Sequence, residues 1–501
     1  MQKKYKHVIS VFLAFILIAL LYFDYVSAFT FITLLNKILF AIVALMGFGI
    51  LIQKAEAFDG TYFGIYWIGT KKGLNLVTYL SKKYKNFLDA LSLWGLFLGF
   101  GFFSYKFFKN EIKRTGFLKI AAIGIITIIF ISLILPFLSI ITLQLIKIPQ
   151  LSSLSLANVS VSTIVNQYSS NYVLYVFLLI SVIAGFSGLM FVLLFFSAYI
   201  TLSQISASVY KYILTINSSH PIYTAPSNII PGVIPVIPGL DIPLFAGIIS
   251  LVVIIVIHEL SHGILAKSFK IKIKSMGVVL FGIIPIGAFV EPNEAEIKKL
   301  KKFKQTKILS AGPSANFFAM MLFSIPSLLI FIFVLPHISS TGIFINSVTN
   351  NFPANNTLKP GMQILSWDGY KVSNISNFSK IALNDRPGQR ISVVTNTGSY
   401  NFTAKQDPGN LSRGIIGITA LEKQYIYNTP YSKSVYFFYT LFSLLFVLNF
   451  FIAIVNLLPI PGLDGWRIYH SNIKSKKFIN LLQILIIFTI VINIVPWFFI
   501  I

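Results

Sequence analysis

Repeated apolar runs of about 20 residues are the feature that most constrains the fold of this chain. A run of that length can cross the hydrocarbon core of a bilayer as a helix. Of the 501 residues, 56% are hydrophobic and 11% are charged, and a soluble domain carries about twice that charged fraction. The sequence therefore predicts an α-helical polytopic membrane protein. About nine spans are expected, near residues 8–28, 30–51, 87–107, 117–146, 172–200, 241–266, 308–335, 435–458 and 478–499.

Residues 340–422 differ from the apolar runs on either side. Short strand-like runs, such as Ile391–Thr395 and Tyr400–Ala404, alternate there with Gly, Pro, Asn and Asp turn signals. The pattern predicts a soluble β-rich domain inserted between two spans. Asp368-Gly369 within it favours a tight turn between two strands.

The net charge of +25 comes mainly from lysines in short segments between the apolar runs. Cytoplasmic loops of membrane proteins have this composition, and so do surfaces that face anionic lipid. We therefore expect contact with the lipid bilayer and no binding of nucleic acid. The lysine-rich loop 267–307 indicates the cytoplasmic side, and the mixed stretch 52–86 is expected to lie along the membrane surface.

An H-E-x-x-H motif, His258 to His262, follows the apolar run Leu251–Ile257. Residues four apart share one face of a helix, so both imidazoles can reach one metal ion, and Glu259 beside them can accept a proton from water. With six histidines and seven glutamates in the chain, random placement gives only about 0.001 copies of this motif. A polar cluster that joins helices, or a transport site for metal or protons, is the alternative.

Catalytic zinc needs a third protein ligand. Asp464 is the only acidic residue between Glu422 and the C-terminus, and it follows a helix-breaking stretch that contains Pro459, Pro461 and Gly462. Broken backbone at membrane depth is tolerated where it is buried in protein or lines a cavity. Asp464 is therefore the candidate ligand, and a simple turn residue before Gly465 is the alternative.

Three segments together resemble the site-2 protease family of intramembrane zinc metalloproteases, particularly its archaeal members with an inserted PDZ domain. They are H-E-L-S-H-G at 258–263, A-G-P-S-A-N-F at 311–317 and N-x-x-P…D-G at 456–465, and the resemblance covers roughly 238–501. It implies that His258, His262 and Asp464 bind Zn²⁺ and that Glu259 is the general base. It also implies that Asn456 lies near the scissile bond, with an interhelical hydrogen bond as the alternative.

The resemblance further implies hydrolysis of peptide bonds within or near the transmembrane segments of membrane-protein substrates, as in regulated intramembrane proteolysis. The expected location is the plasma membrane of an archaeon, as a multi-pass protein. A metal-ion transporter and a catalytically inactive membrane scaffold are the alternatives. The expected divisions are an N-terminal membrane region with accessory spans (1–220), a first part of the catalytic membrane core (221–336), a PDZ-like domain (337–424) and a second part of the core (425–501).

Several shorter segments complete the expectations. Gly312, Ala315 and Asn316 are expected to allow close helix packing beside the H-E-x-x-H helix. The segment 287–292 resembles a strand-like loop to which substrate could add as a strand, or else a plain connection. Gly342–Ile345 resembles the loop of a PDZ domain that receives a peptide carboxylate. The PDZ-like domain is therefore a candidate for peptide binding, and a groove that only screens bulky substrates is the alternative. Five prolines between 226 and 243 exclude a regular helix and indicate a gate or a rigid surface loop.

Overall fold

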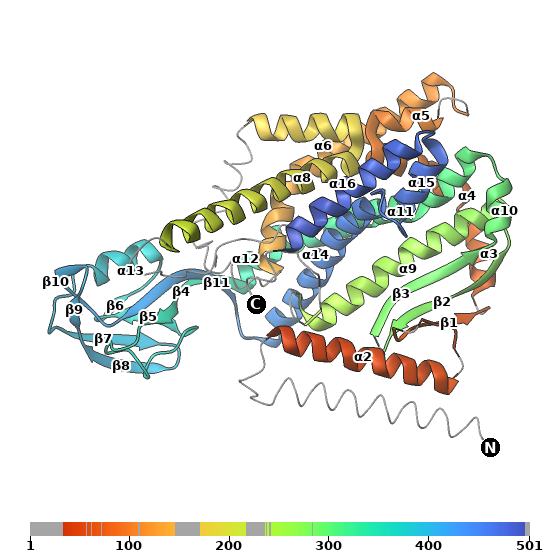
Figure 1. Ribbon diagram of the computed structural model, residues 1–501. Helices are drawn as coiled ribbons and strands as arrows, with labels where there is room; N and C mark the ends of the chain where they lie inside the picture. Colours follow the sequence, from red (N-terminus) through yellow and green to blue (C-terminus); the bar gives the residue numbers. More distant parts are fainter. Residues whose placement is uncertain are drawn as a thin grey trace, which may run out of the picture. The chain divides into compact units, whose positions relative to one another are not determined.

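The computed structural model describes residues 34–56, 58–61, 63–71, 73–108, 111–145, 171–216, 236, 238–239, 242–282 and 284–495. They form two compact units (Figure 1). The helical unit contains the described residues up to 145 together with 171–323 and 444–495, and the β-rich unit contains 324–443. The division falls inside two long helices, α11 (Lys302–Leu329) and α14 (Pro430–Asn456). Most of the predicted proline-rich loop lies outside the described residues.

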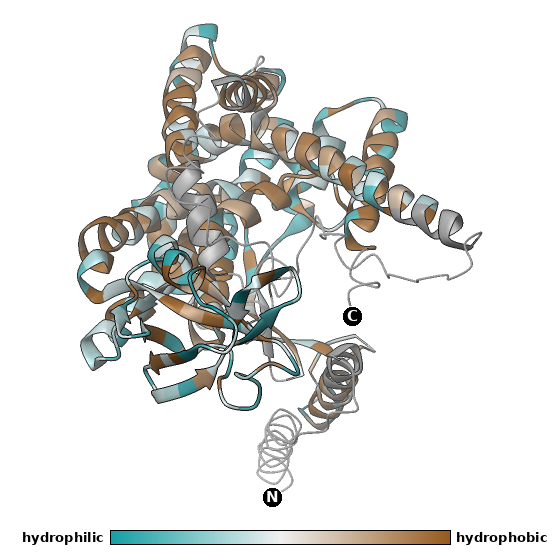
Figure 2. Cartoon of the chain, turned by 90° about the vertical axis from the view of Figure 1, so that its left-hand side faces the viewer, coloured by the Kyte–Doolittle hydropathy of each residue, from teal (hydrophilic) through white to brown (hydrophobic). Residues whose placement is uncertain are grey.

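Seven helical segments of the described residues are long and apolar enough to cross a membrane, and the helices are mainly hydrophobic in Figure 2. Each overlaps one of the predicted spans, so the chain is a polytopic helical membrane protein. The predicted span 8–28 lies outside the described residues, and 30–51 overlaps a helix that is not among the seven. The seven are Lys85–Phe108, Arg114–Ile134, Leu174–Ala207, Leu244–Ser268, Lys302–Ile338, Pro430–Asn456 and Lys476–Ile494.

The helical unit also contains a small antiparallel sheet in the order β1-β2-β3. Besides the ends of α11 and α14, its elements are α2 (Leu34–Glu56), β1 (Ile65–Thr70), α3 (Leu74–Lys83), α4 (Lys85–Phe100), η1 (Gly101–Ser104), α5 (Tyr105–Phe108), α6 (Arg114–Leu145), α8 (Asn171–Ile216), α9 (Leu244–Ser268), β2 (Ile273–Phe281), β3 (Ile284–Pro292), α10 (Glu294–Lys299), α15 (Asp464–Asn472) and α16 (Lys476–Ile494).

The sheet joins distant parts of the sequence. β1 pairs with β2 over its whole length, from Ile65 opposite Phe281 to Thr70 opposite Met276. β2 then pairs with β3, and β3 packs along α9 (Figure 1). The stretch 52–86, expected along the membrane surface, therefore contributes the outer strand of a sheet and the helix α3. The sequence could not indicate this pairing, because more than 200 residues separate the two strands.

Helix α4 packs tightly against the helices of the predicted core. The Oγ of Ser310 on α11 donates to the carbonyl oxygen of Ser92 at 3.3 Å, and the backbone of Gly95 lies against Ser314. Ser187 of α8 also donates from Oγ to the carbonyl oxygen of Gly99 in α4, at 2.6 Å. The N-terminal membrane region and the predicted core therefore share one packed interior.

The β-rich unit is built on a sheet in the order β11-β4-β5-β7-β8, with β6 paired to β5 and a separate β9–β10 pair. Its elements, apart from the ends of α11 and α14, are η3 (Ile330–Val334), α12 (Leu335–Ile338), β4 (Ser339–Val348), β5 (Gln363–Trp367), β6 (Tyr370–Lys371), α13 (Ile375–Ala382), β7 (Arg390–Thr395), β8 (Gly398–Thr403), β9 (Lys405–Asp407), β10 (Asn410–Ile415) and β11 (Ile418–Ile426).

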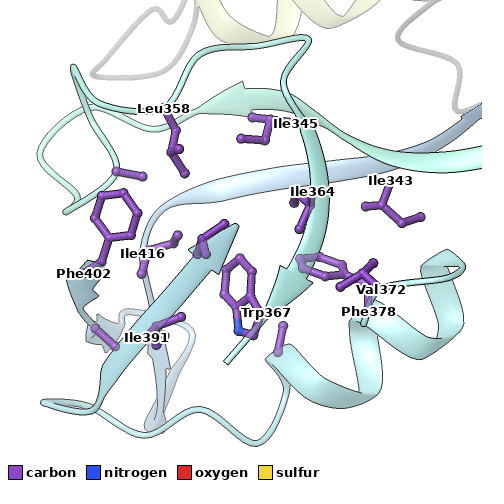
Figure 3. Close-up of a cluster of buried hydrophobic side chains, with 14 residues drawn as sticks. Ile343, Ile345, Leu358, Ile364, Trp367, Val372, Phe378, Ile391, Phe402 and Ile416 are labelled. Atoms are coloured by element: carbon purple, nitrogen blue, oxygen red, sulfur yellow. The ribbon is translucent and has the colours of Figure 1, made fainter. Parts of the chain in front are cut away.

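Alternating apolar residues of the strands form the interior of the β-rich unit, around Trp367 and the helix residue Phe378 (Figure 3). These two rings lie edge to face with centroids 5.1 Å apart. The predicted Asp368-Gly369 turn is present between β5 and β6, with φ of 52° and 80°. Positive φ at both positions is what a two-residue hairpin turn requires.

The prediction for Gly342–Ile345 as a carboxylate-binding loop is wrong. These residues lie inside β4, which pairs with β11 on one side and β5 on the other. Ile343 and Ile345 are both buried in the core. Since a strand paired on both sides uses its backbone N–H groups within the sheet, this segment cannot receive a peptide carboxylate.

Candidate metal centre

Helix α9 carries the H-E-x-x-H motif on a buried face. His258 is buried and His262 nearly so, because the helix is covered here by α11 and β3. Apolar residues fill the preceding turns, which makes a regular helix the natural structure in a bilayer. The i, i+4 spacing brings the two Nε2 atoms to 3.2 Å from each other.

Asp464 reaches the same point from a distant segment. After α14 ends at Asn456, the chain turns through Gly462, which has a φ of 94°, and Asp464 begins α15. Gly465 must lack a side chain, because a Cβ there would lie 2.5 Å from the carbonyl oxygen of Leu458. The Oδ2 of Asp464 lies 3.1 Å from Nε2 of both His258 and His262.

The three atoms fit a tetrahedral zinc site. Zinc binds imidazole nitrogen and carboxylate oxygen at about 2.0–2.2 Å, so the edges of a regular tetrahedron of such ligands are about 3.3 Å. The observed edges are 3.1, 3.1 and 3.2 Å. Among the residues that the structure describes, these are the one group of three histidine or acidic side chains close enough to share an ion. A face of the tetrahedron is thus present, with the fourth corner left for water or substrate.

Helix α11 contacts the far side of both imidazole rings. Nδ1 of His262 lies 2.7 Å from the carbonyl oxygen of Ile308, and Nδ1 of His258 lies 3.1 Å from Nδ2 of Asn316. Partners of this kind orient metal-binding histidines. Asn316 was expected first of all to allow close helix packing, and the structure adds that it is a fully buried amide in contact with His258. The sequence signal was a strongly polar residue within an apolar span.

Gly312 lies directly beside the Nε2 atoms of His258 and His262. A Cβ built on it would overlap Nε2 of both histidines, at 2.6 Å from that of His258. Van der Waals contact needs about 3.5 Å or more between such atoms. The close helix approach that was predicted for Gly312 is therefore present, and it occurs at the metal centre itself.

The two remaining predicted residues differ in their surroundings. Glu259 is partly exposed, and within the described part of the chain its carboxylate has no hydrogen bond or ion pair, which leaves it able to accept a proton. Asn456 ends α14 and donates from Nδ2 to the carbonyl oxygen of Ile452 in its own helix, at 3.0 Å. It has no hydrogen bond to the three clustered side chains in the described residues, and its predicted role at the scissile bond stays a prediction.

Known proteins that are similar to this chain include an archaeal and a bacterial protein. A protein of Methanocaldococcus jannaschii that is named as uncharacterised is 35% identical over 239 residues, which cover 47% of this chain and 60% of that protein. A protein of Fusobacterium nucleatum with the provisional name zinc metalloprotease is 26% identical over 297 residues, 44% of this chain and 85% of that protein. The chain thus spans only about three fifths of the archaeal relative.

The family profile of peptidase family M50 matches residues 246–496. This range is about half of the chain, and it contains nearly all of α9, the whole of α11 and the loop after α14. His258, Glu259, His262 and Asp464 all lie within it. The protein therefore belongs to peptidase family M50, the family of the site-2 proteases.

Proposed function

We propose that this chain is an intramembrane zinc metalloendopeptidase that cleaves membrane-protein substrates within or near their transmembrane segments, as in regulated intramembrane proteolysis. The triangle formed by His258, His262 and Asp464 next to Glu259 carries this proposal. Membership of family M50 and the name of the Fusobacterium relative support peptide hydrolysis with zinc. The similarity to a Methanocaldococcus protein supports an archaeal source, and the proposed location is the plasma membrane of such an organism.

The chain's own residues divide the chemistry between them. His258, His262 and Asp464 would hold zinc, which when bound acts as a Lewis acid and lowers the pKa of water. Glu259 accepts the proton of the attacking water and delivers it to the leaving amine. Asn456 uses one Nδ2 hydrogen within its helix, and the rest of its amide is available to orient the substrate backbone.

The edge strand β3 offers a place for an extended substrate. A helical substrate hides its carbonyl groups, so a segment must unwind before cleavage. β3 ends the β1-β2-β3 order, and its Val290 packs against Gly263, the residue after His262. An added strand there would gain main-chain hydrogen bonds next to the H-E-x-x-H helix. This supports the substrate interpretation of 287–292 over that of a plain connection.

The β-rich unit is proposed to be PDZ-like and to bind peptides, at a different place from the one expected. β11 is an edge strand of its sheet, and α13 lies beside it. Glu422 of β11 accepts the backbone N–H of Ile375, at the start of α13, at 2.8 Å. An extended peptide could pair with the outer edge of β11 next to this helix.

The decisive experiment replaces Glu259 by Gln in the full chain, reconstituted in liposomes with a panel of single-span membrane proteins. Removal of a general base is expected to reduce cleavage by about 10²–10⁴-fold, while the zinc content measured by emission spectrometry stays at one ion per chain. Glu294→Gln is the matched control, because that carboxylate is largely exposed and pairs only with Arg467 in the described residues.

Undiminished cleavage by the zinc-loaded Glu259→Gln protein would falsify the proposed role. Zinc accumulation in sealed vesicles that persists in Glu259→Gln and is lost in His258→Ala would instead favour a metal transporter. Binding of substrate with no cleavage by the wild-type protein under any metal load would favour an inactive scaffold.

A further inference from the structure

Each histidine of the metal centre uses its two ring nitrogens for different purposes. Nε2 faces the other ligands, and Nδ1 faces α11. For His262 the partner of Nδ1 is the carbonyl oxygen of Ile308. A carbonyl only accepts, so Nδ1 of His262 carries the hydrogen and Nε2 keeps the lone pair that a metal requires. The main chain therefore fixes the tautomer of this ligand.

The corresponding partner of His258 is a side chain. Nδ1 of His258 lies 3.1 Å from Nδ2 of Asn316, which is 0% exposed. An amide can present either its NH₂ group or its oxygen to the ring. With NH₂ toward the ring, Nδ1 must accept, and the hydrogen of the neutral imidazole then sits on Nε2, where it blocks metal binding. With oxygen toward the ring, Nδ1 donates and Nε2 is free.

The surroundings do not hold the amide in the first orientation. Oδ1 of Asn316 is buried and has no hydrogen-bond partner among the described residues. A half-turn about the last side-chain bond exchanges oxygen and NH₂ with little change of shape. Among the described residues, either orientation leaves one amide group of Asn316 without a partner. The number of hydrogen bonds is then equal, and the requirement of a metal for a free Nε2 on His258 favours the orientation with oxygen toward the ring.

We propose that Asn316 is a positioning residue that accepts the Nδ1–H of His258 and thereby keeps its Nε2 ready for zinc. This inference rests on the proposed zinc function. Removal of the hydrogen-bond partner of a metal-binding histidine typically lowers the metal affinity by about 10–100-fold. Because the partner of His262 is a backbone atom, the tautomer of His258 is the one of the pair that a single substitution can disturb.

The test measures zinc affinity of the full-length protein in detergent by competition with a coloured chelator, and the absorption spectrum of the cobalt-loaded form. Asn316→Leu has a similar volume and no acceptor, and it is expected to weaken zinc binding about 10–100-fold and to alter the cobalt spectrum. Asn316→Asp offers only acceptors to the Nδ1–H, and it is expected to keep most of the wild-type affinity and the wild-type spectrum.

Asn449→Leu is the matched control. Asn449 on α14 is also 0% exposed, its Oδ1 also has no partner among the described residues, and its Nδ2 bonds to the carbonyl oxygen of Leu445 in the same helix. This variant carries the same general cost to folding, and its zinc affinity is expected to equal that of the wild type.

If Asn316→Leu keeps the wild-type zinc affinity and cobalt spectrum, the role of Asn316 is overturned and the proposed zinc function is not. The same holds if Asn449→Leu loses as much zinc affinity as Asn316→Leu. Asn316→Asp keeps the proposal testable if the leucine variant does not fold, since a large loss of affinity in the aspartate variant contradicts it. A wild-type protein that binds no zinc would overturn the proposed function as well.

Discussion

The two units bury side chains for different purposes. In the β-rich unit the interior is a cluster of apolar residues around Trp367, whose volume fills the space between the sheet and α13. In the helical unit the contact between α9 and α11 buries His258 and Asn316 next to small residues such as Gly312 and Ala315. The first interior depends on volume, and the second on the position of a few atoms. A single added methyl group should therefore disturb metal binding in the second interior, whereas the loss of a large side chain should lower the stability of the first and leave metal binding unchanged.

Gly312→Ala provides the strongest test of this contrast. The added Cβ would overlap both Nε2 atoms, so the two imidazoles must move by about an ångström, and zinc affinity and proteolysis are each expected to fall about 100-fold, the upper end of the effect of changes around metal-binding histidines. Chelator competition and the cleavage assay measure the two effects.

Gly69→Ala is the control for an added methyl group in the same unit, because its Cβ would meet no atom closer than 3.7 Å. It should leave both quantities unchanged. Normal zinc binding by Gly312→Ala would show that the α9–α11 contact is more adaptable than the contrast requires.

Trp367→Ala tests the other half of the comparison. Removal of this buried ring should lower the free energy of unfolding of the β-rich unit by about 3–5 kcal/mol, and it also removes the N–H that Asp385 accepts at 2.9 Å. Limited proteolysis between 339 and 426 reports the loss. Leu411→Ala, at a side chain that is 68% exposed, serves as the control. Zinc affinity is expected to stay at the wild-type value, and a parallel fall would contradict the separate roles of the two interiors.

Asp385→Asn is expected to give the smallest effect. Burial raises the pKa of the Asp385 carboxyl, and the nearby charge of Asp368 adds to this, against the hydrogen bond from Trp367. The folded state then binds the proton more tightly than the unfolded state, so the wild type gains stability as the pH falls through the raised pKa toward about 3.9. The amide introduced by the substitution carries no charge, and its oxygen can still accept from Trp367.

The Asp385→Asn protein should therefore be the more stable one at pH 7, and its advantage should shrink toward pH 4. Thermal unfolding of the β-rich unit at both pH values checks the sign. An advantage that grows with acid would show that the carboxylate is stabilised, and not destabilised, by its surroundings.

Local pattern was sufficient to predict which three side chains come together at the candidate metal centre. His258 and His262 belong to one short motif, and Asp464 is conspicuous as an acid that follows a broken apolar run. The turn signals of residues 340–422 also predicted the β-rich insert. The strand character of Gly342–Ile345 could have been recognised, because Ile343 and Ile345 alternate as a buried strand does. The resemblance of this segment to the carboxylate-binding loop of PDZ domains favoured the wrong prediction instead.

Two relations in the structure depend on tertiary packing and could not be predicted from the sequence. The contact of Asn316 with His258 depends on which face of α11 meets α9, and an apolar helix in a bilayer carries little amphipathic pattern to indicate this. The pairing of β1 with β2 depends on a register between segments more than 200 residues apart. Neither relation follows from spacing along the chain.

The β1–β2 pairing also imposes a parity rule on the chain. Two strands that share backbone hydrogen bonds must lie on the same side of the bilayer, so the chain between them crosses an even number of times. Within the described residues, four candidate spans lie between Thr70 and Ile273, namely Lys85–Phe108, Arg114–Ile134, Leu174–Ala207 and Leu244–Ser268. An even count places the lysines that follow β1 on the same side as the lysine-rich loop 267–307. The pairing of a six-residue strand thus constrains the membrane topology of the four candidate spans that the described residues place between it and its partner.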